Sequence, residues 1–127
     1  AAALVAVGCA VLRWRPFGVV VAGSSMAPAL EPGDWALAVV ARRDPRRGSV
    51  VVVEHPERPG FEIVKRVVAV AGDVAPGGRA LADGELWVQG DAPDGSTDSR
   101  HFGVVRRDQV RGSIVLVYWP AARRRLM

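Results

Sequence analysis

The stretch VVVAGSSMAPALEPGDWALA, residues 19–38, joins two runs of strand-forming residues through a loop. Pro28 and Pro32 have no backbone N–H to donate to a neighbouring strand, and Gly33-Asp34 is a turn signal. The sequence therefore predicts two strands that are separated by an irregular segment. Two interpretations of that segment are open: a loop that presents a reactive serine, or an ordinary turn of a β-domain.

Similar valine-rich runs continue along the chain. The sequence predicts strands over residues 17–22, 35–41, 49–55, 61–72, 85–89 and 110–120. The continuous apolar run within 49–55 indicates burial on both faces. We expect residues 74–91 to form a hairpin around a two-residue Asp83-Gly84 turn, followed by a loop over 92–103. A chain of 127 residues then suits one mostly β domain of antiparallel strands.

We expect three parts along the chain: an N-terminal apolar segment (1–16), a β catalytic domain (17–120) and a basic tail (121–127). The apolar run before Arg13 is shorter than the roughly 20 residues that span a bilayer. The sequence RWRPF follows it, with cations and an indole ring of the kind found at membrane interfaces. We expect the remnant of a membrane anchor here; a short lead into the first strand and a signal-type apolar core are the alternatives.

The composition narrows the classes of ligand. The net charge of +4 comes largely from arginine pairs and a triplet, without the interleaved aromatic residues of a nucleic-acid stacking platform. The sequence therefore predicts no nucleic-acid partner, whereas an anionic membrane surface would attract these charges. A single cysteine and two isolated histidines predict no metal site, and we expect no cofactor.

Lys65 is the one lysine among 17 lysine and arginine residues. In the strand over 61–72 it shares a face with Ile63 and Val67, because alternate residues of a strand point the same way. Burial favours the neutral amine, which can act as a base, whereas arginine effectively never deprotonates. A serine nucleophile needs such a base. The alternative is a lysine whose stem lies on apolar surface while its amine reaches water.

Three blocks of the sequence resemble the type I signal peptidases, the serine/lysine membrane proteases that remove leader peptides. GSSMAPALEPGD is similar to the block of that family that carries the nucleophile, which assigns Ser25 and not Ser24. VKRVVAVAGD is similar to the block that carries the general-base lysine, which assigns Lys65. GDAPDGSTDSRHFG is similar to the carboxy-terminal block, whose supporting residues map to Ser96, Asp98 and Arg100. The blocks occur in the family's order.

The resemblance implies a β-fold of the signal-peptidase and LexA type and a compact bacterial member of the family. It implies that Lys65 takes the proton of Ser25, which forms an acyl-enzyme, and that Gly23, Ser24 and Met26 belong to the oxyanion and substrate loop. The Ser25 N–H would hold the oxyanion, and Gly23 would allow a close backbone approach. The implied partners are an extended leader-peptide segment, cut after small residues, and membrane lipid.

The resemblance also implies location in the bacterial cytoplasmic membrane, with the catalytic domain outside the cytoplasm. Arg13 and Arg15 by themselves favour a cytoplasmic position for that end of the apolar run.

Three alternatives remain at this point. The maturation proteases of nickel-containing superoxide dismutase have similar blocks and the same mechanism with one dedicated substrate. Self-cleaving repressors of the LexA type also pair Ser-Met with a lysine, but lack the Ser-Thr-Asp-Ser-Arg block. A non-catalytic β-module at a membrane surface would carry Ser25 and Lys65 as ordinary loop and strand residues.

Overall fold

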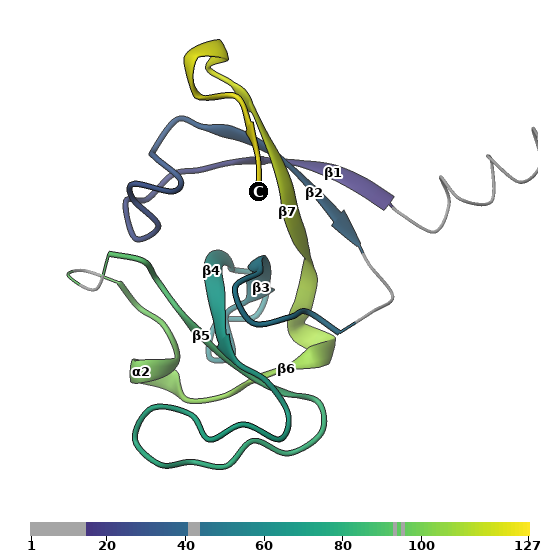
Figure 1. Cartoon of the computed structure of the whole chain (residues 1–127), viewed down its shortest axis with the longest axis vertical. Helices are drawn as coiled ribbons and strands as arrows, with labels where there is room; N and C mark the ends of the chain where they lie inside the picture. The colour runs from purple at the N-terminus through teal and green to yellow at the C-terminus, as the bar shows by residue number, and fades with distance from the viewer. Residues whose placement is uncertain (1–14, 41–43, 93, 95) are drawn as a thin grey trace, which may run out of the picture.

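The computed structural model describes residues 15–40, 44–92, 94 and 96–127 (Figure 1). The strands are β1 (Arg15–Val20), β2 (Trp35–Val40), β3 (Val50–Glu54), β4 (Glu62–Ala69), β5 (Glu85–Gln89), β6 (Val105–Arg106), β7 (Val110–Trp119) and β8 (Arg125–Leu126). A short helix, α2 (Ser99–Phe102), and two 3-10 turns, η1 (Arg107–Gln109) and η2 (Ala121–Arg123), complete the assigned elements. All strand pairs are antiparallel, which confirms the mostly β fold that the sequence predicts.

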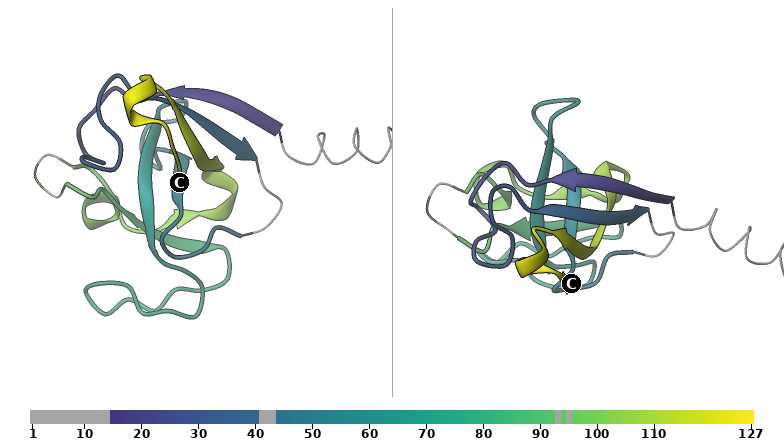
Figure 2. Two further views of the ribbon diagram at one scale, coloured as in Figure 1. Left: turned by 45° about the horizontal axis from the view of Figure 1, so that its top comes forward. Right: turned by 90° about the horizontal axis from the view of Figure 1, so that it is seen from above.

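The strands form one sheet in the order β1-β2-β7-β3-β4-β5-β6, and β8 pairs with β7. β7 thus lies between the β1-β2 hairpin and the β3-β4 hairpin, although it comes last of these strands in the chain. Its register shifts against both neighbours, as at β-bulges, which bend a strand. Figure 2 shows the result: β1 and β2 run across the direction of β3 and β4, so the sheet is strongly curled.

β3 carries the core on both of its faces. Val50 and Val52 pack into a cluster beneath β1 and β2. Val51 and Val53 pack into a second cluster with residues of β4, β5 and β6. Both clusters are buried, because the curled sheet folds one half over the other. The predicted burial of this valine run on both faces is confirmed.

The predicted hairpin around Asp83-Gly84 is wrong. The turn itself is present, with the Glu85 N–H donating to the Ala82 carbonyl at 3.1 Å. However, β5 pairs with β4 and β6, and the residues before the turn contribute one isolated bridge, Val74 to Ala80. The reason is packing. Ala75 and Leu81 are buried in a small third cluster against β5 and the end of β4, so the residues before the turn form a packed loop and not a strand.

The segment 121–127, expected as a basic tail, folds back onto the sheet. Pro120 ends β7, η2 reverses the chain, and β8 pairs with β7 through Leu126 opposite Leu116. The expected anchor within 1–16 lies almost wholly outside the described residues. Among residues that the structure describes, no helix has the length and apolar character that a bilayer crossing requires.

Candidate active site

The side chains of Ser25 and Lys65 meet although they are 40 positions apart in the chain. The Lys65 Nζ lies 2.7 Å from the Ser25 Oγ. Ser25 belongs to the segment between β1 and β2, residues 21–34, which we call the Ser25 loop; Lys65 is on β4. Short backbone turns shape the loop, with the Ala27 N–H donating to Ser24 and the Leu30 N–H donating to Met26. The structure therefore brings together the two residues on which the sequence interpretation depends.

Lys65 is buried in apolar surroundings, with 4% of its surface exposed. Its neighbour Val67 on the same strand face and Val51, its partner on β3, are also buried. Burial lowers the pKa of the Lys65 amine below its ordinary value of 10.5; the nearby Asp98 carboxylate opposes this change and the Arg100 guanidinium adds to it. The amine therefore loses its proton more readily than a lysine in water.

Ser96, Asp98 and Arg100 form a hydrogen-bonded chain behind Lys65. The Lys65 Nζ donates to the Ser96 Oγ at 3.3 Å, and the Ser96 hydroxyl donates to Asp98 Oδ2 at 2.8 Å. Arg100 binds the same carboxylate through Nε at 2.9 Å and Nη2 at 2.5 Å. The structure thus connects all three predicted supporting residues to the amine, directly or through one another.

Asp98 is fully buried and organises the loop between β5 and α2. It caps α2 by accepting the Arg100 N–H, and it also accepts the Gly90 N–H at 2.8 Å. Burial alone would raise the pKa of Asp98, but the hydrogen bonds from Arg100, Gly90 and Ser96 outweigh it and hold the pKa well below its usual range. Asp98 is therefore a permanent anion beside the lysine, and the loop expected over 92–103 contains a short capped helix.

Gly90 is a site residue that sequence reasoning missed. A Cβ at this position would lie 2.3 Å from the Ser96 Oγ and 2.7 Å from the Ser25 carbonyl oxygen. No side chain fits there without moving one of them. Nearby, the Ala92 N–H donates to the Ser25 carbonyl at 2.8 Å, so the backbone after β5 holds the serine. The signal was present in the Gly90-Asp91 pair that opens the third block, but spacing alone does not reveal what the glycine contacts.

Arg66 and Asp91 form a second unpredicted link between the lysine strand and this loop. Arg66 Nε and Nη2 bind the two Asp91 carboxylate oxygens at 2.9 and 2.8 Å, and Nη1 donates to the Gly48 carbonyl at 2.8 Å. A two-point contact of this kind fixes orientation as well as distance. The segment that contacts Ser25 is therefore tied to the residue next to Lys65.

The remaining predicted residues of the Ser25 loop differ in their surroundings. Met26 is buried in the core cluster beneath β1 and β2, whereas Gly23 and Ser24 are exposed. No atom of a distant residue lies within 4 Å of a Cβ built at Gly23, so the close approach expected there does not involve this chain's own atoms. At Gly90, by contrast, the protein packs too closely for a side chain.

Ser25 and Lys65 face an apolar cleft of about 450 Å³. One wall is β1 and the residues that follow it, including Val19 and Val21; the other is the start of β4, including Ile63. β1 is an edge strand of the sheet, with β2 on one side only. An edge strand leaves backbone N–H and C=O groups unpaired, so an extended peptide can add to it.

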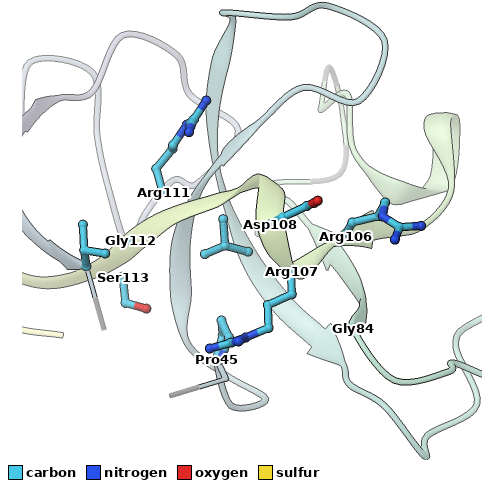
Figure 3. A pocket seen from close by; sticks show the side chains of 10 residues that line it. Pro45, Gly84, Arg106, Arg107, Asp108, Arg111, Gly112 and Ser113 are labelled. Carbon is cyan, nitrogen blue, oxygen red and sulfur yellow. The ribbon is translucent and has the colours of Figure 1, made fainter. Parts of the chain in front are cut away.

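A second hollow, of about 440 Å³, lies away from this constellation (Figure 3). Arg106, Arg107 and Arg111 line it and point in different directions in Figure 3. Arg107 and Arg111 are paired with Asp44 and Glu54. None of the predicted site residues lines it.

One protein family and several known proteins are similar to this chain. The family described as signal peptidase, peptidase S26, matches residues 1–76 and 74–119. Mitochondrial inner membrane protease subunit 1 of Xenopus tropicalis is 32% identical over 114 residues, which cover 80% of this chain and 68% of the relative. The ATP-independent inner membrane protease subunit 1b of Arabidopsis thaliana mitochondria is 36% identical over 113 residues, 77% of this chain and 67% of the relative. Mitochondrial inner membrane protease subunit 2 of Mus musculus is 33% identical over 120 residues, 81% of this chain and 67% of the relative. The chain therefore belongs to the signal peptidase family, peptidase S26, a family of proteases.

Proposed function

We propose that Ser25 and Lys65 are the catalytic dyad of a membrane-associated serine endopeptidase that removes leader peptides. The observation that carries the proposal is the 2.7 Å contact between the Lys65 Nζ and the Ser25 Oγ at a lysine that is buried. A serine hydroxyl becomes a nucleophile when a base within hydrogen-bond reach removes its proton. Because burial lowers the pKa of Lys65, the neutral, basic amine forms at a lower pH than it does for an ordinary lysine.

The contacts of the amine suit this role. A neutral amine has two N–H bonds and one lone pair. One N–H donates to the Ser96 Oγ, whose own proton is directed to Asp98. The lone pair can then accept the Ser25 proton, because Ser96 fixes the rotation of the amine. Asp98 and Arg100 act as positioning residues for Ser96 and do not touch the reacting atoms.

In the proposed reaction the Ser25 Oγ attacks the scissile carbonyl carbon while Lys65 takes the hydroxyl proton. The C–N bond breaks as Lys65 returns the proton to the leaving amine, which leaves an acyl-enzyme on Ser25. Lys65 then takes a proton from water, the hydroxide attacks the ester, and Ser25 recovers its proton. In the described part of the chain no hydrogen bond uses the Ser25 N–H, which leaves it available to the oxyanion.

The substrate that we propose is an extended segment with small side chains before the cut. Strand addition along β1 would bind its backbone regardless of sequence. The buried Met26 follows Ser25 in the chain and lines the same cleft. The names of the relatives describe proteases of a membrane, which agrees with a leader peptide that emerges from one.

An exposed apolar cluster supports membrane association. Val20 pairs with Trp35, and Trp35 pairs with Trp119, across three neighbouring strands. Tyr118 packs edge-on against Trp35 at a ring distance of 6.3 Å, and all four side chains are exposed. Tryptophan and tyrosine are enriched at the water boundary of bilayers. A bacterial cytoplasmic membrane with the site outside the cytoplasm stays a prediction, since the relatives named above are mitochondrial.

The test is labelling with an acylating serine probe, followed by peptide mapping of the adduct. The wild-type protein should be labelled at alkaline pH on Ser25, Ser25→Ala should not be labelled, and Ser24→Ala should still be labelled. The same proteins are then given a leader peptide with small residues before the cut. Absence of labelling in the wild type, or labelling that survives in Ser25→Ala, would favour the non-catalytic β-module.

A further inference from the structure

The segment 121–127 makes direct contacts with the Ser25 loop, and no block of the sequence interpretation includes it. The Arg123 Nε lies 2.8 and 3.1 Å from the two carboxylate oxygens of Asp34. Its Nη2 donates to the Pro28 carbonyl at 3.2 Å. Arg125 Nη2 donates to the Ala29 carbonyl. Two cations from one segment therefore bind the loop at three positions, all after Ser25.

Asp34 is the central point of this contact. It is 1% exposed, and one of its oxygens accepts the Glu31 N–H at 2.9 Å inside the same loop. Its backbone closes the loop: the Val21 N–H donates to the Asp34 carbonyl at 2.9 Å, and the Gly33 N–H donates to Val21 at 2.8 Å. A buried carboxylate requires a partner for its charge. Arg123 is that partner, so the observed geometry of the loop depends on it.

The 121–127 segment is itself fixed to the sheet. The backbone of Arg125 is paired with Val117 of β7, and the Met127 N–H donates to the Val115 carbonyl at 3.0 Å. β7 is also the strand that lies between β2 and β3. The loop is thus bound from one side by the backbone around Gly90 and Ala92, and from another side by side chains attached to β7.

We propose that residues 121–127 are a clamp that holds the Ser25 loop in its reactive geometry, with Arg123 as its principal positioning residue. This inference rests on the proposed function of Ser25. Arg123 touches neither Ser25 nor Lys65; it acts through Asp34 and the Pro28 carbonyl. A displacement of the nucleophile by about 1 Å is enough to reduce the rate roughly a hundredfold, so a loosened loop lowers kcat before it unfolds the protein.

The test uses the whole chain with Arg123→Gln, Arg123→Lys and a matched control, Arg124→Gln. Arg124 is the next residue in the same segment, but its Nε donates to the Tyr118 carbonyl of β7 and not to the loop. The control removes the same charge from the same segment. Arg125→Gln is a milder variant, since the exposed Arg125 side chain donates to one carbonyl of the loop, and it serves if Arg123→Gln does not fold.

Two measurements are made on each variant: kcat and KM on a leader peptide, and hydrogen exchange of the amides over residues 24–34. Arg123→Gln should lower kcat about tenfold or more with a smaller effect on KM, because no residue of 121–127 lines the cleft. Exchange over the loop should accelerate by a similar factor, and Arg123→Lys should fall between wild type and Arg123→Gln. Arg124→Gln should match the wild type in both measurements.

Wild-type kcat and wild-type loop exchange in Arg123→Gln would overturn the clamp while leaving the dyad intact. Equal losses in Arg123→Gln and Arg124→Gln would also overturn it, because they would show a general effect of charge or stability. If the wild type itself is not labelled on Ser25, the proposed function fails. In that case the hydrogen exchange of the amides over residues 24–34 tests by itself whether Arg123 holds the loop.

Discussion

Gly90 lies against Ser25 so closely that a Cβ on it would stand 2.7 Å from the Ser25 carbonyl oxygen. The same Cβ would meet the Ser96 Oγ at 2.3 Å. Gly90→Ala must therefore displace either the Ser25 backbone or the Ser96 hydroxyl, to which Lys65 donates a hydrogen bond. Overpacking of this kind costs about 1–3 kcal/mol of stability. We expect kcat to fall by roughly a hundredfold at a temperature where the variant is still folded.

Gly112→Ala is the matched comparison for this variant. A Cβ at Gly112 would be equally crowded, at 2.7 Å from the Val39 carbonyl oxygen and 2.8 Å from the Phe17 ring, but it lies outside the Ser25 and Lys65 contacts. It should lower the melting temperature while kcat is retained. Equal losses of kcat in the two variants would show that the effect of Gly90→Ala is general strain.

The proposed base predicts an alkaline rise in activity. Because Lys65 must be neutral to accept the Ser25 proton, kcat/KM should rise with pH through the pKa of Lys65, which burial places below 10.5. Lys65→Arg should abolish cleavage although it preserves the charge, since a guanidinium does not deprotonate at these pH values. The measurement is the pH profile of leader-peptide cleavage. Cleavage by Lys65→Arg at the wild-type rate would show that Lys65 is not the base.

The charges of Asp98 and Arg100 predict opposite shifts of the pH profile of cleavage. The Asp98 carboxylate raises the pKa of Lys65, so Asp98→Asn should move the midpoint of the rise to lower pH. The Arg100 guanidinium lowers the pKa of Lys65, so Arg100→Gln should move the midpoint to higher pH. Both variants also lose hydrogen bonds of the loop and should have lower maximal rates. Midpoints that move in the same direction would contradict this electrostatic assignment.

The Asp34–Arg123 pair predicts how stability depends on acid. Burial favours the neutral form of Asp34, but the hydrogen bonds from Arg123 and the Glu31 N–H, with the charges of Arg123 and Arg125, hold its pKa below the ordinary 3.8. A carboxylate with a lowered folded-state pKa contributes stability above its unfolded pKa and loses it as the pH falls through the folded value. The gap in melting temperature between wild type and Arg123→Gln should thus be widest near neutral pH and narrow below pH 3.8.

Thermal melts of both proteins between neutral and acid pH measure this gap, with Arg124→Gln as the comparison. The gap for Arg124→Gln should not change with pH in this range, because Arg124 contacts a backbone carbonyl and no carboxylate. A gap for Arg123→Gln that is equally wide at every pH would mean that Asp34 is not its partner in solution.

Local sequence patterns predicted the burial of residues better than they predicted contacts between distant segments. Lys65 was identifiable because strand alternation and apolar neighbours depend on adjacent residues only, and its burial is observed. The continuous valines of β3 likewise indicate burial on both faces from local pattern alone. That Ser25 lies within contact of Lys65 came from the resemblance of the blocks, since no periodicity relates residues that are 40 positions apart.

The misses concern contacts between distant segments. Gly90 reads as a turn glycine in the sequence, and only the position of Ser96 and Ser25 shows why a side chain is excluded. From the sequence, Arg123 and Arg125 were expected only as part of a basic tail, because their acceptors on the Ser25 loop are 89 and 96 positions away in the chain. The hairpin before β5 failed because a local turn signal does not tell which strand will be the partner.

The central position of β7 also bears on when Ser25 and Lys65 can meet as the protein is made. A ribosome releases the β1-β2 and β3-β4 hairpins first, and each can pair by itself. In the described sheet no ladder joins β2 to β3 directly; both wait for the strand over Val110–Trp119. Until Val110–Trp119 has been made, no strand ladder of the described sheet connects the hairpin whose strands precede and follow Ser25 with the hairpin that carries Lys65.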